Sequence, residues 1–246
     1  MIRRLWSELG QIVVVLAIVL VTRAVVAQPF YVPSGSMEPT LQIGDELLAS
    51  KFAYGFSRYS LPVDLPPSVE GRLLGKAPRR GDVVVFRLPR APDEVYVKRV
   101  IGLPGDRIRM QDGHLIINGE RLPLRPQGED TVELQDGHRV PALRLIETLP
   151  GGREHPILKL TWNGPLDNAG EFVVPAGRLF MMGDDRDNSL DSRVAAEEGG
   201  VGFVPMENLI GRADVILGSW DFPVISQPVS AWLSGLRLSR FFSLVS

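Results

Sequence analysis

Apolar residues are concentrated in one stretch near the N-terminus and occur in short runs along the rest of the chain. Residues 12–21 are unbroken apolar, and extending this run to residues 5–27 gives a helix long enough to cross a hydrocarbon layer of roughly 30 Å. Arg3 and Arg4 precede the run, so the positive-inside tendency places the N-terminus in the cytoplasm and the body across the membrane. The alternative is a cleaved secretory signal with residues 25–27 as its small-residue cleavage site.

Beyond residue 41 the pattern changes to short strands separated by turns. Strands are predicted for five alternating or continuous apolar runs, at residues 47–49, 82–87, 94–101, 178–182 and 210–217. Asp112-Gly113 and Asn118-Gly119 favour tight turns between paired strands, and Asp136-Gly137 repeats the first of them. The sequence has no long amphipathic helix, phosphate-binding glycine loop or metal-spaced His/Glu pair, so we predict a mainly β fold.

The turn density also suggests how the body is divided. Residues 103–178 are richer in turns and polar residues than the segment before them, which indicates an inserted β-rich subdomain. Residues 28–102 and 179–246 would then form the two parts of one β core, with residues 1–27 as the membrane segment. The aromatic residues after residue 219 either pack in this core or rest on the bilayer surface.

Composition narrows the possible chemistry. The net charge is −2, which becomes −4 for residues 28–246 because the first 27 residues carry three arginines and one glutamate. A weakly acidic body argues against nucleic acid as a partner. The chain has no cysteine, so disulfides and thiolate metal sites are excluded. Among the basic residues only four are lysines, and arginine does not act as a base, so a general base must be a lysine, one of three histidines or a carboxylate.

The four lysines occupy different settings. Lys98 lies inside an apolar strand, where burial lowers the amine pKa and makes a neutral base available near neutral pH. The alternative is an edge-strand lysine that points to water and guards against sheet pairing. Lys51, Lys76 and Lys159 lie near loops or strand ends, and we expect them to face solvent.

The three histidines are poorer candidates. His114 and His138 lie in or beside Asp-Gly turns, and His155 precedes Pro156 in an expected loop. We expect all three to be exposed turn residues.

A polar loop at residues 33–41 is the best candidate for a nucleophile. Ser34 and Ser36 flank Gly35, and Pro33 and Pro39 bracket the group, which predicts a rigid turn that holds a hydroxyl at a set angle. A linker between the membrane segment and the body is the alternative. A serine hydroxyl needs a neighbouring base, and a lysine can replace the histidine of a Ser–His–Asp triad.

Residues 183–193 contain four aspartates, two arginines and two serines. We expect a hydrogen-bonded turn with internal ion pairs, especially for Asp184, Arg186 and Asp187. A hydroxyl of Ser189 or Ser192 could in addition orient a catalytic lysine.

Together these segments resemble the motifs of the bacterial type I signal peptidases. The matching segments, in order, are residues 33–41, 43–45 with 51–55, 80–86, 96–106 and 183–193, the last followed by 202–205. The resemblance implies that Ser36 is the nucleophile and Lys98 its general base. It also implies that the Ser34 hydroxyl and the Ser36 backbone N–H form the oxyanion hole.

The resemblance further implies that Ser189 holds the lysine amine, while Asp191 and Arg193 support the site. The expected fold is a β catalytic core of the kind shared with LexA, interrupted by the inserted β subdomain and retained at the membrane by one helix. The expected reaction is removal of signal peptides from exported preproteins, after small residues of the Ala-x-Ala type, at the outer face of the bacterial cytoplasmic membrane. Preprotein signal peptides and lipid are the expected partners, and no metal, cofactor or nucleic acid is expected.

Two features depart from the family pattern. The family often has more than one membrane span, and residues 194–201 form a longer link than usual before residues 202–205. Two other interpretations stay open. One is a LexA-like self-cleaving repressor, which would need a DNA-binding module, and the other is a membrane-tethered β-rich binding protein whose catalytic site is inactive.

Overall fold

The structure is a computed structural model, and it describes residues 8, 10–15, 19, 26–60, 71–134, 138–221 and 233–246. Within these residues nearly all regular structure is antiparallel strand, so the predicted mainly β class is confirmed. The predicted span at residues 5–27 lies largely outside the described residues. Among the residues that are described, none belongs to a helix long and apolar enough to cross a membrane.

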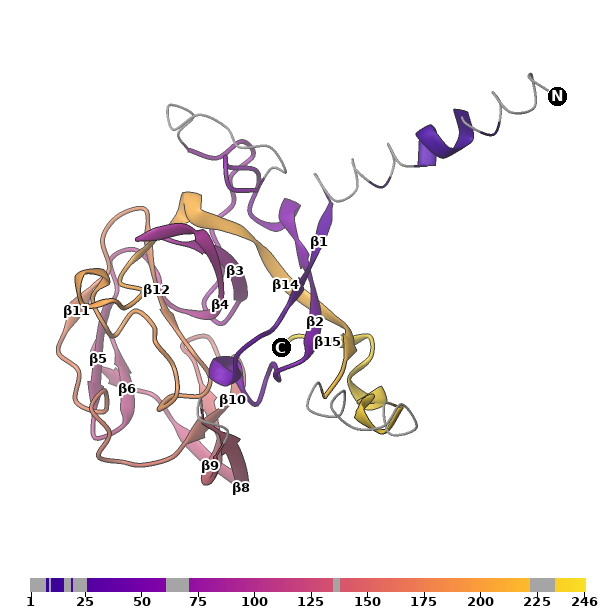
Figure 1. Cartoon of the computed structure of the whole chain (residues 1–246). Helices are drawn as coiled ribbons and strands as arrows, with labels where there is room; N and C mark the ends of the chain where they lie inside the picture. The colour runs from indigo at the N-terminus through magenta and orange to yellow at the C-terminus, as the bar shows by residue number, and fades with distance from the viewer. Residues whose placement is uncertain are drawn as a thin grey trace.

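The largest sheet has eight strands and forms the body of the molecule (Figure 1). Its strands, in spatial order, are β1 (Ala27–Tyr31), β2 (Asp45–Ser50), β14 (Leu209–Ser219), β3 (Val83–Leu88), β4 (Ala91–Gly102), β12 (Arg178–Met182) and β13 (Val204–Pro205), and β15 (Ser243–Leu244) pairs with β14. All five predicted strands are therefore confirmed. The continuous apolar run of β3 is explained by its central position, because Val83 to Phe86 are at most 2% exposed.

Two smaller sheets come from the middle of the chain. One contains β11 (Phe172–Val173), β5 (Arg107–Gln111), β6 (His114–Ile117) and β7 (Glu120–Arg121); the other contains β10 (Glu154–Lys159), β9 (Arg139–Thr148) and β8 (Leu124–Glu133). Asp112 and Asn118 have φ values of 50° and 53° and connect β5–β6 and β6–β7, so the two predicted hairpins are confirmed. The third predicted turn, at Asp136-Gly137, lies outside the described residues. The domain boundaries stay a prediction.

Apolar side chains pack on both faces of the large sheet. Val83 and Val85 of β3 join one buried cluster, and Val84 and Phe86 join another on the opposite face, as strand alternation requires. The first cluster also contains Met37 and Leu41 of the serine loop. The loop is therefore held in place by residues buried in the core.

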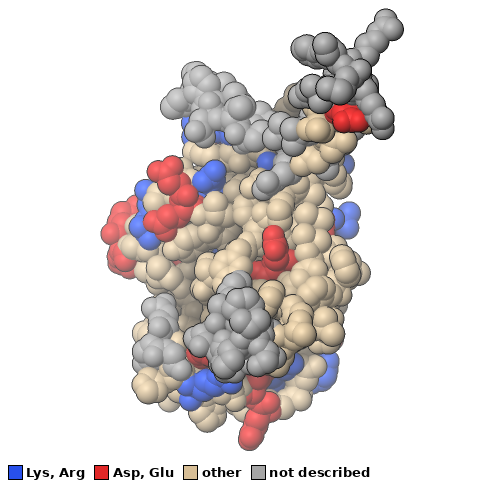
Figure 2. All heavy atoms as spheres, turned by 45° about the vertical axis from the view of Figure 1, so that its right-hand side comes forward, with Lys and Arg blue, Asp and Glu red and all other residues tan. Residues whose placement is uncertain are grey.

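Charged side chains are interspersed by sign on the face drawn in Figure 2, where acidic and basic groups lie side by side toward the left and lower edges. Much of the centre of this face is uncharged. The C-terminal aromatic residues are divided among environments, since Phe241 lies against Gly218 while Phe242 is 74% exposed. Phe222 and Trp232 lie outside the described residues.

Candidate active site

The serine loop is tied at both ends. Ser36 lies in a 3₁₀ turn, η1 (Gly35–Met37), directly after β1. Where the loop begins and ends, Val32 donates to the Asp45 carbonyl at 2.9 Å and Gly44 donates to the Val32 carbonyl at 3.0 Å. These backbone bonds and the buried Met37 leave the half-buried Ser36 side chain facing a cleft.

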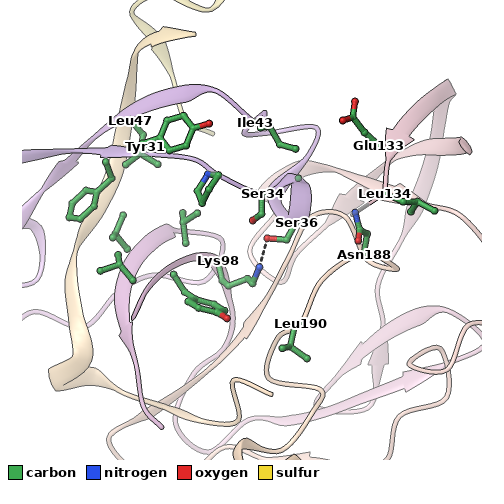
Figure 3. A pocket seen from close by; sticks show the side chains of 17 residues that line it. Tyr31, Ser34, Ser36, Ile43, Leu47, Lys98, Glu133, Leu134, Asn188 and Leu190 are labelled. Carbon is green, nitrogen blue, oxygen red and sulfur yellow. Dashed lines mark hydrogen bonds between the residues drawn. The ribbon is translucent and has the colours of Figure 1, made fainter. Parts of the chain in front are cut away.

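Lys98 reaches Ser36 from β4. Its Nζ donates a hydrogen bond to Ser36 Oγ across 62 positions of sequence (Figure 3). Lys98 is 3% exposed, so the alternative of an edge lysine that points to water is wrong. Burial lowers the pKa of Lys98 from 10.5 to about 8, although the carboxylates of Asp191 and Asp184 oppose the shift. A neutral amine is therefore accessible close to physiological pH.

A buried ion pair lies beside the dyad. Arg99, the residue after Lys98, donates from Nε and Nη2 to the two carboxylate oxygens of Asp184 at 2.8 and 2.7 Å. Asp184 also accepts a 2.5 Å bond from the Thr40 hydroxyl, so the serine loop and β4 share one acceptor. Burial alone would raise the pKa of Asp184, but the Arg99 guanidinium holds it well below its usual value.

Arg186 and Asp187 also pair outside the 183–193 turn, so the expectation of internal ion pairs is wrong for both of them, as it is for Asp184. Arg186 donates to the two carboxylate oxygens of Glu147 in β9 at 2.8 and 2.5 Å, and Asp187 accepts from Lys159 in β10 at 2.7 Å. The turn therefore joins the large sheet to β9 and β10 through bonds that no local pattern specifies.

The solvent-facing predictions for three side chains are also wrong. His155 is 2% exposed and lies between Glu147 and Asp184, at 3.2 Å and 3.5 Å. Lys159 and Lys51 are 1% and 2% exposed. For His155 and Lys159 the reason is tertiary, because β10 pairs with β9 and its Leu158 bridges to Asp185 in the turn. His138 and Lys76 are exposed, as expected, and His114 stacks on Trp162.

The supporting residues implied by the motif all lie in the 183–193 turn, whose backbone contacts Ser36. Asp191 accepts bonds from the Gly183 N–H and the Arg193 guanidinium, and this internal pair is fully buried. Ser189 Oγ is buried but makes no hydrogen bond within the described part of the chain, so the implied contact with the lysine amine is not formed here. The Ser192 hydroxyl bonds to the Met181 N–H and the Gly202 carbonyl, and therefore holds the backbone instead of the lysine.

Gly183 explains how closely these segments approach. A Cβ at this position would overlap both Ser189 Oγ and the Ser36 carbonyl oxygen. The Ser36 carbonyl also accepts the Asp185 N–H at 3.2 Å, so the turn contacts the backbone of the nucleophile directly.

The Ser36–Lys98 pair sits in the middle of a cleft of about 640 Å³. On one side the lining includes apolar side chains of β1 to β4, among them Tyr31 and Leu47 (Figure 3). On the other side it includes Glu133, Leu134 and Asn188, with Ser34 close to Ser36. β1 is an edge strand of the large sheet, so among the described residues no strand pairs with its outer side along the apolar half.

Comparison with known proteins identifies the family of the chain. Residues 5–220 match the family model described as signal peptidase, peptidase S26. The chain belongs to the signal peptidase family. It is therefore a serine peptidase, as the motifs indicated.

Two relatives known from sequence support the same assignment. Signal peptidase I of Rickettsia typhi is 39% identical over 252 residues, covering 96% of this chain and 92% of that protein. Signal peptidase I of Rickettsia felis is 37% identical, with 96% and 91% covered. The crystal structure of a signal peptidase I from Enterococcus faecalis V583 shares 27% identity and covers 56% of this chain and 97% of that one, with a TM-score of 0.33.

Two parts of this signal peptidase site were not predicted from the sequence. Thr40 and Arg99 are joined through Asp184, and the end of β8 brings Glu133 and Leu134 to the cleft. The hydrogen bond from Thr40 to Asp184 joins residues 33–41 to residues 183–193, two segments that the motifs had already singled out. No signal in the sequence pointed to Glu133 or Leu134, because their place at the cleft depends on where the sheet of β8, β9 and β10 packs.

Proposed function

We propose that this signal peptidase removes N-terminal signal peptides from exported preproteins, with Ser36 as nucleophile and Lys98 as general base. The observation that carries the proposal is the buried Lys98 amine hydrogen-bonded to Ser36 Oγ at the centre of the cleft. An amine whose pKa is lowered to about 8 by burial is largely neutral at slightly alkaline pH and is then able to accept the hydroxyl proton.

The reaction follows from this geometry. Ser36 Oγ attacks the scissile carbonyl carbon while Lys98 Nζ takes its proton, and the carbonyl oxygen becomes an oxyanion. The Ser34 hydroxyl and the Ser36 N–H donate hydrogen bonds to that oxyanion. The C–N bond then breaks as the Lys98 ammonium returns the proton to the leaving amine, which leaves an ester on Ser36. Water, deprotonated by Lys98, hydrolyses the ester and releases the signal peptide.

The apolar half of the cleft accounts for the expected preference for small residues before the cleaved bond. An extended segment can add to the free edge of β1 or to residues 95–97 of β4, which pair only with β3 among the described strands. Its alternate side chains would face Leu47, Val85 and Val97, which leave room for small groups of the Ala-x-Ala type.

We further propose that residues 5–27 form a retained, single membrane span, with the catalytic body at the outer face of the cytoplasmic membrane. The proposal rests on the basic residues before the apolar run and on the family. In this scheme residues 28–102 and 179–246 form the catalytic core, and residues 103–178 form the inserted subdomain.

The test is direct cleavage by the purified full chain in detergent. A precursor with an Ala-x-Ala site should be cut after the second alanine, which N-terminal sequencing of the product establishes. Ser36→Ala and Lys98→Met should each abolish turnover, whereas Lys76→Met, which removes an exposed lysine, should leave it intact. Near-normal turnover by either dyad variant contradicts the assignment. Binding of the precursor without cleavage by the unmodified protein would favour a binding protein with a dead site.

A further inference from the structure

The polar half of the cleft is formed partly by the inserted strands. Glu133 ends β8, and Leu134 follows it and is held by a 2.8 Å bond from its N–H to the His138 carbonyl. Both residues line the cleft on the side of Ser36 opposite Tyr31 and Leu47 (Figure 3).

The direction in which the substrate chain runs through the cleft indicates which of its residues meet the polar half. If the apolar half takes the small residues that precede the cleaved bond, the bond itself lies at Ser36 Oγ. The chain that follows the bond must then leave across the other half, past Asn188, Glu133 and Leu134. The first residues of the mature protein therefore come within reach of the Glu133 carboxylate.

Carboxylates are grouped at this end. Glu133 also lines a neighbouring polar pocket together with Glu38 of the serine loop and Asp130 of β8. The pKa of Glu38 is raised, mainly by burial and in part by the charges of Glu133 and Asp130, which is consistent with a shared negative field.

Three arginines, Arg139, Arg144 and Arg237, also line this polar pocket, and those next to Asp130 and Glu133 pair with them to different degrees. Asp130 is paired with Arg144 at 2.7 Å, but Glu133 accepts two longer bonds of 3.3 Å from Arg139, both to Oε2. The side chain of Arg139 is 70% exposed, so this pair is weak and a substrate cation can compete with it. Glu133 is thus a carboxylate with spare acceptor capacity on the wall of the cleft.

We propose that Glu133 and Leu134 form the binding site for the first two residues after the cleaved bond, and that Glu133 makes this site favour basic over acidic side chains. The inference rests on the proposed function. Leu134 supplies an apolar surface for the stem of a lysine or arginine, while Glu133 accepts from its charged end. An acidic side chain in the same place meets like charge and loses this partner.

The experiment measures kcat/KM of the full chain in detergent on peptides that share one Ala-x-Ala signal end. Lys, Asn or Asp is placed at the first or the second position after the bond. We expect the Lys peptide to be cleaved about fivefold faster than the Asp peptide at one of these positions, the size typical of a partly exposed ion pair. Glu133→Gln should reduce the Lys-to-Asp ratio to about one, and Glu133→Lys should invert it, as expected when the charge itself is responsible. The ratio should also shrink as salt is raised.

Glu129→Gln is the matched control, because Glu129 lies on the same strand but is exposed and does not line the cleft. It should keep both the ratio and the turnover of the unmodified enzyme. A ratio that survives in both Glu133 variants, or that Glu129→Gln removes equally, overturns the inference while leaving the proposed function standing. Failure of the unmodified enzyme to cleave any of the peptides overturns both.

Discussion

Asp185 carries a buried carboxylate that the fold does not satisfy, and its replacement by asparagine should stabilise the protein. The residue is 0% exposed, and neither carboxylate oxygen has a hydrogen-bond partner of ordinary geometry within the described residues. Burial, with the nearby charge of Glu38, raises the pKa of Asp185 to about 7, and Asn188 opposes only part of this shift. The Asp185 backbone N–H, which bonds to Ser36, is kept in the variant.

The size of the effect follows from the two pKa values. A change from 3.8 to about 7, at 1.36 kcal/mol per pH unit, corresponds to about 4 kcal/mol against the ionised form in the folded state. We expect about half of this, ~2 kcal/mol, because the surroundings relax around the charge.

Linkage between protonation and folding gives the direction of the pH dependence. Because the folded-state pKa is the higher one, the folded protein binds more protons than the unfolded chain between about pH 4 and pH 7. The free energy of unfolding contributed by Asp185 is therefore lost as pH rises through this window. Asp185→Asn has no such group, so its advantage should be near zero below pH 4 and complete above pH 7.

Urea unfolding of the full chain in detergent, followed by circular dichroism at pH 4, 5.5, 7 and 8.5, measures this difference. Asp184→Asn is the matched control with the opposite sign, because it leaves Arg99 buried without its partner and should destabilise the protein. The reasoning is refuted if Asp185→Asn is no more stable than the unmodified protein at pH 8.5, or if its advantage is the same at every pH.

Three further predictions concern the site itself. The kcat/KM for peptide cleavage should rise with pH and reach half its maximum near pH 8 as Lys98 loses its proton; a flat profile from pH 6 to 9 would exclude it as the base. Ser34→Ala should lower kcat by about 100- to 1,000-fold with little change in KM, through loss of one oxyanion donor, and a loss under tenfold in a kinetic assay would argue against that role. Gly183→Ala should reduce the activity and should lower the free energy of unfolding by about 2 kcal/mol or more, because the new Cβ overlaps the Ser36 carbonyl and Ser189. Unchanged urea unfolding would show that the turn can shift.

Local patterns were sufficient for much of the fold. The runs at residues 82–87 and 178–182 predicted β3 and β12 closely, since a strand between two buried faces needs apolar residues throughout. Asn118-Gly119 predicted a hairpin because a tight turn needs positive φ at these positions. The candidate dyad could also be predicted from the sequence, since only four lysines exist and Lys98 lies inside a predicted apolar strand.

The exposure and the ion-pair partners of charged residues were predicted less well than the strands. His155 and Lys159 were expected in solvent but are buried, and the ion pairs of Arg186 and Asp187 reach into β9 and β10. Whether a charged residue is exposed depends on which distant segments pack over it, and the sequence of a single strand does not determine that packing.

The sequence by itself determined the strands, the turns and the groups available for catalysis, because each of these depends on neighbours within a few residues. Only the tertiary structure decided that the amine of Lys98 meets Ser36 in a buried place, and that Glu133 at the end of β8 lines the same cleft. Both contacts join segments far apart in the chain, and the low exposure that tunes the Lys98 pKa exists only once those segments have packed.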